Sequence, residues 1–226
     1  FNKSSAFTEE ERDELGLRGL LPPRVSTFDE QVTRLKGIID TYEKPINKYI
    51  VLEGAHNSDE SLYFELLVRY IDQFLPIVYT PTVGQACLQY SHIFRYARGL
   101  YVSTEDKGRV RQLVANVPHK DVDIIVVTDG QRILGLGDLG VNGMGIPVGK
   151  LALYTACAGV NPQKTLPVCI DVGTNNEELL NDPLYMGLRQ KRVTGPEYDA
   201  LIAEFVDAVR ERWPNVVIQF EDFHNS

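Results

Sequence analysis

Five side chains have the types and positions that acid–base and metal chemistry require: Tyr79, Arg132, Lys150, Glu221 and Asp222. Lys150 stands in the first turn of a predicted helix, and the residues that follow it, 151–154, are mostly apolar. Burial and the helix dipole both disfavour a positive charge at this position, so the pattern predicts a lowered pKa and a general base. The alternative is a lysine whose amine extends into solvent.

Each of the other four residues also allows a structural interpretation. Tyr79 lies in a turn between two predicted helices, where it suits a general acid or a core aromatic with a hydrogen-bonded hydroxyl. Glu221 and Asp222 follow a predicted strand and are hard oxygen ligands for Mg²⁺ or Mn²⁺, unless Asp222 caps a following helix. Arg132 suits bidentate binding of a substrate carboxylate, or a surface ion pair.

Two glycine motifs resemble nucleotide-binding loops and are better explained otherwise. Residues 135–140 match GxGxxG, but more loop follows the third glycine, and no acidic residue stands near 158–160, where a ribose would require one. We interpret this segment as a flexible loop that wraps a small ligand. Gly149 and Lys150 resemble the end of a P-loop, but the upstream spacing is wrong and Leu151 replaces the hydroxyl residue.

The second half of the chain, after Pro118, alternates strands and helices. Apolar, β-branched runs predict strands at 122–128, 166–172 and 216–220, and helices are predicted at 147–158 and 196–212, the second with a capping box from Thr194 to Glu197. This order predicts a parallel sheet covered by helices, with ligands at the carboxyl ends of its strands. Those ends carry residues 129–132, 171–175 and 221–222.

The first half of the chain has helical periodicity. Capping boxes at Thr8 and Thr27 begin two helices, 59–75 forms another, Thr80 with Pro81 begins a fourth, and Thr104 caps one more. The predicted fold class is therefore α/β. A helical N-terminal domain, residues 1–117, precedes an α/β domain, residues 118–226, that contains a short parallel sheet with flanking helices.

Composition excludes several classes of protein. The chain has 226 residues and a net charge of −8, so neither nucleic acid nor an anionic membrane surface is an expected partner. No apolar run approaches the ~20 residues of a membrane span. Three widely spaced cysteines in apolar stretches predict core residues rather than disulfides or zinc ligands: Cys87, Cys157 and Cys169. The histidines lack metal-ligand spacing and are expected on the surface or in loops: His56, His92, His119 and His224.

Five long motifs resemble one family, the malic enzymes of the long eukaryotic and bacterial type. They are residues 20–23 (LLPP), 76–84 (PIVYTPTVG), 127–140 (VTDGQRILGLGDLG), 143–150 (GMGIPVGK) and 218–223 (IQFEDF). The resemblance implies oxidation of (S)-malate by NAD or NADP and decarboxylation to pyruvate and CO₂ with Mg²⁺ or Mn²⁺.

The resemblance also implies a role for each candidate residue. Tyr79 would be the general acid that protonates the enol of pyruvate, and Lys150 the general base that takes the malate hydroxyl proton. Arg132 would bind a malate carboxylate. Glu221 and Asp222 would be two of three protein ligands to the metal.

The family pattern continues beyond Ser226 with a third aspartate ligand and an NAD(P)-binding Rossmann domain. We therefore expect a fragment, which the start at Phe1 without a methionine also suggests, and expect it to be inactive alone because hydride transfer needs a bound acceptor. By resemblance, a homodimer or homotetramer would form through the helical domain. The expected compartment is the cytoplasm, or the mitochondrial matrix in a eukaryote. The alternatives are a malolactic enzyme and a non-catalytic oligomerisation or effector-binding module.

Overall fold

The computed structural model describes residues 3–224, and the chain divides into two compact units, Phe1–Ile77 and Val78–Ser226. The described part of the first unit contains the short turn η1 (Ser4–Ala6) and helices only. These helices are α1 (Glu9–Glu14), α2 (Phe28–Asp40), α3 (Pro45–Ser58), α4 (Glu60–Arg69) and α5 (Ile71–Val78), whose last residue begins the second unit.

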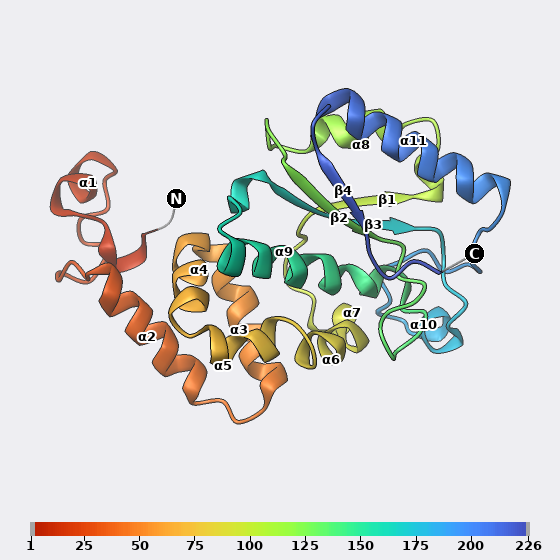
Figure 1. The fold of residues 1–226 in the computed structure, drawn as a ribbon. Coiled ribbons are helices and arrows are strands. Elements are labelled where there is room, and N and C mark those ends of the chain that lie inside the picture. The colour runs from red at the N-terminus through yellow and green to blue at the C-terminus, as the bar shows by residue number, and fades with distance from the viewer. Residues whose placement is uncertain (1–2, 225–226) are drawn as a thin grey trace. The chain divides into compact units, whose positions relative to one another are not determined.

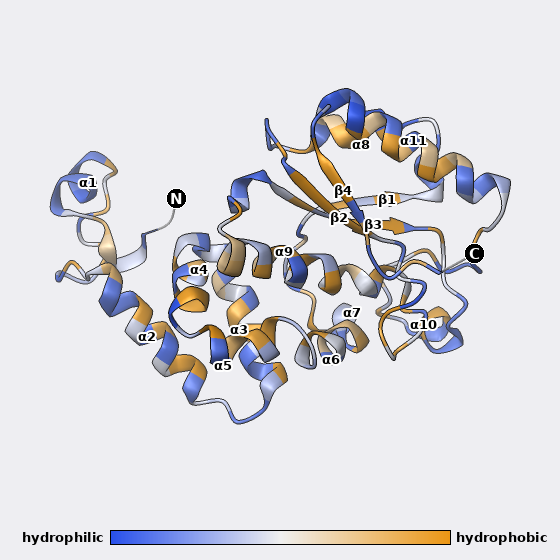
Figure 2. Ribbon diagram, in the orientation of Figure 1, coloured by the Kyte–Doolittle hydropathy of each residue, from blue (hydrophilic) through white to orange (hydrophobic). Residues whose placement is uncertain are grey.

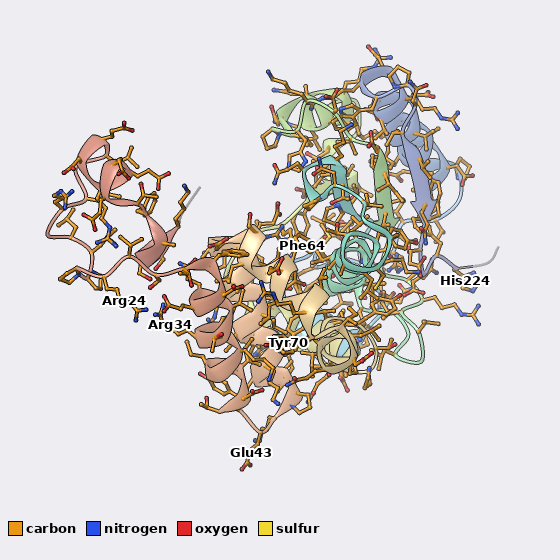
Figure 3. The ribbon with its side chains drawn as sticks, turned by 60° about the vertical axis from the view of Figure 1, so that its left-hand side comes forward. Arg24, Arg34, Glu43, Phe64, Tyr70 and His224 are labelled. Atoms are coloured by element: carbon orange, nitrogen blue, oxygen red, sulfur yellow. The ribbon has the colours of Figure 1, made fainter. Side chains whose placement is uncertain are left out.

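Helices α2, α3 and α4 of the first unit pack on one another. Their 3.6-residue periodicity brings apolar side chains into a common core, whose most buried members are Val32, Ile39, Leu52, Tyr63, Leu66, Leu67 and Phe74. Glu43 lies in the turn between α2 and α3, where its side chain points away from the helices (Figure 3).

The predicted capping boxes at Thr8 and Thr27 are confirmed. Each threonine hydroxyl accepts a hydrogen bond from the backbone N–H three residues later, and the glutamate there accepts one from the threonine N–H. The single helix predicted over 59–75 is wrong, because the chain leaves helical geometry at Tyr70 and starts again as α5. Leu67 and Phe74 are buried on either side of this break, so the hydrophobic period continues through it.

The second unit contains the predicted parallel sheet. Its strands are β1 (Leu100–Ser103), β2 (Ile124–Thr128), β3 (Thr165–Asp171) and β4 (Val217–Phe220), in the order β1-β3-β2-β4, and every neighbouring pair is parallel. Strand β1 was not predicted, because its four residues are too short for a clear apolar alternation.

Helices cover both faces of the sheet (Figure 1). Helix α9 (Gly145–Ala158) lies on one face, against β2 and β3, while α8 (Val110–Asn116) and α11 (Pro196–Arg212) pack together on the other. Between these layers the two central strands, β2 and β3, are strongly apolar (Figure 2), as strands buried on both sides require. The shorter elements α6 (Thr82–Leu88), α7 (Tyr90–Ile93), η2 (Thr104–Asp106), η3 (Gly140–Met144), η4 (Pro162–Lys164) and α10 (Glu177–Asn181) connect these layers.

Three predicted helix caps in this unit are wrong. Helix α6 begins at Thr82 with Pro81 as its N-cap, rather than at a Thr80 cap. Ser103, not Thr104, caps the short η2 turn, with Asp106 accepting its backbone and hydroxyl hydrogens. Helix α11 spans Pro196–Arg212 as predicted, but its N-cap is Gly195 and no side chain caps it, so the predicted capping box from Thr194 to Glu197 is absent.

The cysteine and histidine predictions hold in part. Cys87 and Cys169 are buried, and burial raises the pKa of the Cys87 thiol to about 12. Cys157, predicted in the core, is exposed because it lies near the end of α9, where the helix leaves the sheet. His56, predicted on the surface, is buried in α3 and stacks on Tyr63 with ring centroids 3.9 Å apart. No helix within residues 3–224 is both long and apolar enough to span a bilayer.

Candidate active site

Helix α9 positions Lys150 beside Tyr79 through an unusually close backbone contact. A Cβ atom at Gly149 would lie 2.4 Å from the Val78 carbonyl oxygen and 3.3 Å from Cδ2 of Tyr79. Only glycine permits this approach, which brings the first turns of α9 against the residue that follows α5. The neighbouring Lys150 is thereby held at Tyr79.

Lys150 is paired rather than solvated. Its Nζ donates to Oε1 of Glu221, and the two side chains are only 19% and 15% exposed. The same Nζ lies 5.9 Å from the centroid of the Tyr79 ring. Three predicted site residues, from the start of α9, the end of β4 and the turn after α5, therefore lie together.

The predicted lowering of the Lys150 pKa is wrong. Burial does oppose its charge, but the Glu221 carboxylate, with Tyr79, outweighs burial and raises the pKa of Lys150. The sequence argument took account of desolvation and the helix dipole but could not include a carboxylate 71 residues away. Lys150 is therefore an ammonium group in this structure. Burial is also the largest influence on Tyr79, and it raises the pKa of that phenol although Lys150 opposes it.

The Glu221–Asp222 pair suits a hard divalent cation. Asp222 has a left-handed backbone (φ 57°), and its buried Oδ2 has no hydrogen-bond partner among the described residues. Burial, reinforced by the Glu221 charge, raises the pKa of Asp222. Adjacent carboxylates with an unsatisfied buried oxygen fit Mg²⁺ or Mn²⁺.

The described residues do not by themselves form a complete metal site. Within residues 3–224, no three His, Cys, Asp or Glu side chains are grouped as a metal site would require. The structure also does not show Asp222 capping a helix, since the described residues after it, Phe223 and His224, are not helical.

Arg132 lies at the same edge of the sheet. Its backbone N–H donates to the carbonyl oxygen of Asp222 at 3.1 Å, which ties the loop after β2 to the end of β4. Its side chain is exposed, and the described residues offer it no hydrogen bond or ion pair. The guanidinium group is therefore available to an anionic ligand.

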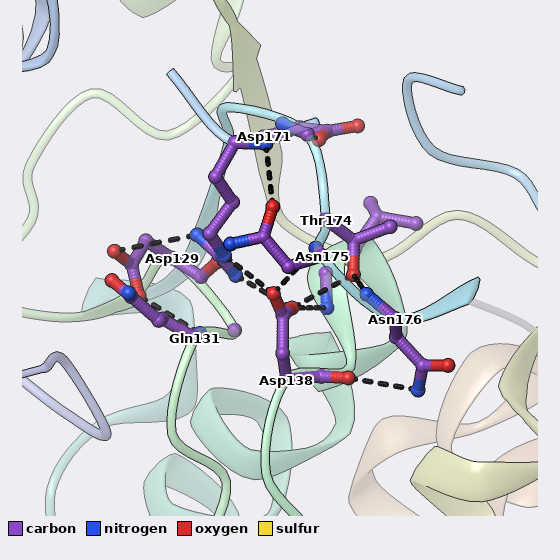
Figure 4. A network of polar contacts seen from close by, with 12 residues as sticks. Asp129, Gln131, Asp138, Asp171, Thr174, Asn175 and Asn176 are labelled. Carbon is purple, nitrogen blue, oxygen red and sulfur yellow. Dashed lines mark hydrogen bonds and ion pairs between the residues drawn. The ribbon is translucent and has the colours of Figure 1, made fainter. Parts of the chain in front are cut away.

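A buried network that the sequence did not reveal holds the loops around this edge (Figure 4). Arg192 donates from Nε and Nη2 to the two carboxylate oxygens of Asp138, at 2.8 and 2.9 Å, and from Nη2 to the Asp129 carbonyl at 2.7 Å. Asp138 also accepts from the Thr174 hydroxyl and the Asn175 N–H. The GxGxxG segment is thus tied down at Asp138. Its third glycine, Gly140, begins the short η3 turn rather than the predicted loop, and α9 begins at Gly145 rather than at the predicted Pro147.

The two aspartates that contact Arg192 have pKa values shifted in opposite directions. Burial opposes ionisation of Asp138, but the Arg192 hydrogen bonds outweigh it and lower the pKa of that carboxyl. For Asp129, burial dominates and raises the pKa, although Arg192 opposes it. Asp129 stands three residues before Arg132, so the network also fixes the base of the loop that carries Arg132.

The sequence analysis also did not identify Gln219, which contacts Glu221, or Tyr154, which contacts Gln219. Gln219 donates from Nε2 to Oε2 of Glu221 at 2.8 Å, and the Tyr154 hydroxyl contacts Oε1 of Gln219 at 2.6 Å. Two sequence signals could have found these residues. Gln219 precedes Glu221 by two residues on a strand, and Tyr154 follows Lys150 by four on a helix, so each shares a face with its partner.

Comparison with known proteins gives a consistent result. The family model described as malic enzyme, N-terminal domain, matches residues 56–226. The chain is 52% identical over 222 residues to NAD-dependent malic enzyme 2 of Photobacterium profundum, an alignment that covers 98% of this chain and 40% of that protein.

Two plant relatives are at least as similar. Over 233 residues the chain is 52% identical to the mitochondrial 59 kDa isoform of NAD-dependent malic enzyme from Solanum tuberosum, covering 99% of the chain and 39% of the relative. Over 225 residues it is 56% identical to the chloroplastic NADP-dependent malic enzyme of Zea mays, covering 99% of the chain and 35% of that relative. The chain thus spans about two fifths of the length of these relatives.

Proposed function

Because the chain belongs to the malic enzyme family, we propose that the protein containing it oxidises (S)-malate with NAD or NADP and decarboxylates the product to pyruvate and CO₂. The chain supplies the malate- and metal-binding part. The convergence of Lys150, Tyr79 and Glu221 on one edge of the sheet is the observation that carries this proposal.

Each site residue has a part that follows from its environment. Arg132, exposed and unpaired among the described residues, binds a malate carboxylate. Lys150 takes the proton of the malate hydroxyl, and Tyr79, whose raised pKa keeps it protonated, delivers a proton to the enol carbon. Both proton-transfer groups are partly buried, which limits competition from water.

Glu221 and Asp222 would hold Mg²⁺ or Mn²⁺. When bound, the cation would polarise the malate C2 oxygen and share the charge of Glu221 that otherwise favours the ammonium form of Lys150. Without such sharing, Lys150 would remain protonated and could not act as a base.

We also propose that the helices within residues 1–117 associate into homodimers or homotetramers, although residues 100–103 of that range form strand β1 of the sheet. Several large apolar side chains of the first unit are exposed, among them Leu20 at 76% and Val68 at 54%, and these are side chains that such an association could cover. We place the protein in the cytoplasm, or in the mitochondrial matrix if it comes from a eukaryote. The printed name of the Solanum tuberosum relative supports the second compartment, whereas that of the Zea mays relative names the chloroplast.

The test is a steady-state assay of the full-length protein with malate, Mn²⁺ and each nucleotide. Equal formation of pyruvate and reduced nucleotide supports the proposal. Lactate as the product would favour a malolactic enzyme, and no turnover with either nucleotide would refute the assignment.

A further inference from the structure

We infer that Tyr154 and Gln219 form a hydrogen-bond relay that orients the Glu221 carboxylate for metal binding. The inference rests on the proposed metal role of Glu221. Neither residue reacts with substrate in this account; both are positioning residues that act through Glu221.

The relay follows from the spacing of residues on two packed elements. Lys150 and Tyr154 are four residues apart on α9, and Gln219 and Glu221 are two residues apart where β4 ends, so each pair lies on one face. Lys150 binds one oxygen of Glu221, Gln219 binds the other, and Tyr154 binds Gln219.

The chemistry of the groups fixes the direction of every hydrogen bond. An ionised carboxylate only accepts, so the Gln219 amide must turn its NH₂ group toward Glu221. The amide oxygen then faces Tyr154, whose hydroxyl must donate to it. Without the Tyr154 hydroxyl, the Gln219 amide could rotate and present its oxygen to Glu221, where two acceptors would repel each other.

The consequence for Glu221 is a fixed carboxylate plane. One donor on each oxygen prevents rotation about the terminal bond and leaves further lone pairs on both oxygens for a cation. Groups that orient a metal ligand in this way typically change metal affinity 10- to 100-fold when they are removed.

The experiment measures the Mn²⁺ dissociation constant of the full-length protein by the electron paramagnetic resonance signal of free Mn²⁺. Gln219→Leu should weaken Mn²⁺ binding about tenfold, and Tyr154→Phe about threefold. The double variant should bind no more weakly than Gln219→Leu alone, because Tyr154 acts only through Gln219. Matched controls are Gln112→Leu and Tyr96→Phe, both exposed, and these should bind like the wild type.

The outcomes separate the relay from the proposed function. If Glu221→Gln weakens binding while Gln219→Leu and Tyr154→Phe do not, the relay is wrong and the metal role of Glu221 stands. Additive effects in the double variant would also overturn the relay. If Glu221→Gln leaves Mn²⁺ affinity unchanged, the metal role fails and the relay with it. If circular dichroism shows that Gln219→Leu does not fold, Tyr154→Phe decides alone: weaker binding supports the relay, and unchanged binding overturns it.

Discussion

Lys150 shows how strongly a single contact controls the chemistry of a residue. Burial alone would favour its neutral amine, yet the ion pair with Glu221 reverses the direction of the pKa shift. To act as the proposed base, Lys150 would have to be released from this pair. A cation held by Glu221 and Asp222 would provide that release, so the proposed base and the proposed metal site would depend on each other.

Replacing the proton-transfer groups should separate catalysis from binding. In the full-length protein, Lys150→Met and Tyr79→Phe should each lower kcat by about 10² to 10⁴, the usual contribution of a general acid or base. Tyr79→Phe should leave the Mn²⁺ dissociation constant within about threefold of wild type. Steady-state kinetics checks this, with Lys164→Met and Tyr96→Phe as exposed controls. Wild-type kcat in either site variant would contradict the assigned role.

Asp138 should make stability depend on pH in acid. Its folded-state pKa lies below the ordinary value of 3.8, so ionised Asp138 stabilises the fold above about pH 4, and this contribution disappears as the pH falls through the lower, folded-state value. Asp138→Asn should lower the unfolding free energy by about 3 kcal/mol at neutral pH, because it removes the carboxylate that hydrogen-bonds buried Arg192 and leaves that charge only the Asp129 carboxylate, 3.6 Å from its Nη1.

Urea denaturation between about pH 3 and pH 7 measures this effect. The gap between wild type and Asp138→Asn should narrow below about pH 4. Asp129, whose pKa is raised, opposes the trend but is present in both proteins. A gap that stays constant with pH would show that the Asp138 charge does not stabilise the fold.

At the scale of elements, helix α9 organises the site through its first turns. Gly149 allows the approach to Val78 and Tyr79, Lys150 faces Glu221, and Tyr154 reaches Gln219 one turn later. Gln219 in β4 and Glu221 just after it are the residues that Tyr154 and Lys150 contact. The site is therefore assembled by the packing of one helix against a strand end and a turn.

Gly149→Ala should disrupt this packing more than the fold. The added methyl meets the Val78 carbonyl at 2.4 Å, so Tyr79 and α9 must move apart, and kcat should fall at least tenfold. Gly54→Ala is the matched control, since its Cβ meets nothing within 4 Å and should stabilise α3 by about 0.5–1 kcal/mol. Thermal melts and kinetics together check both variants, and unchanged kcat in Gly149→Ala would contradict the role of this contact.

Elements were predictable where a long pattern specified them. Strands β2, β3 and β4 and helix α11 follow apolar runs or helical periodicity, and both early capping boxes depend only on neighbouring residues. Strand β1 was missed because a strand of four residues leaves no clear periodic signal. The break at Tyr70 was missed because it involves a single residue. At the N-terminus of α8, the Val110 N–H donates a hydrogen bond to the carboxylate of Glu204 in α11. The two residues are 94 positions apart, so local sequence cannot reveal this contact.

At the scale of the whole molecule, the topology of the sheet determines which distant residues meet. Parallel strands bring the loop of Arg132 and the Glu221–Asp222 pair to one edge, and sequence order alone predicted that edge. The partners that support it, Arg192 for Asp138 and Gln219 for Glu221, depend on side-chain packing. Their identities required the structure.

The central claim is that the Glu221 and Asp222 carboxylates bind a divalent cation beside Lys150 and Tyr79. Anomalous X-ray diffraction from crystals of the full-length protein soaked with Mn²⁺ tests it most directly. The account predicts a manganese peak in contact with both carboxylates, and its loss from crystals of Asp222→Asn. A manganese peak elsewhere, with none at these two residues, would contradict the account.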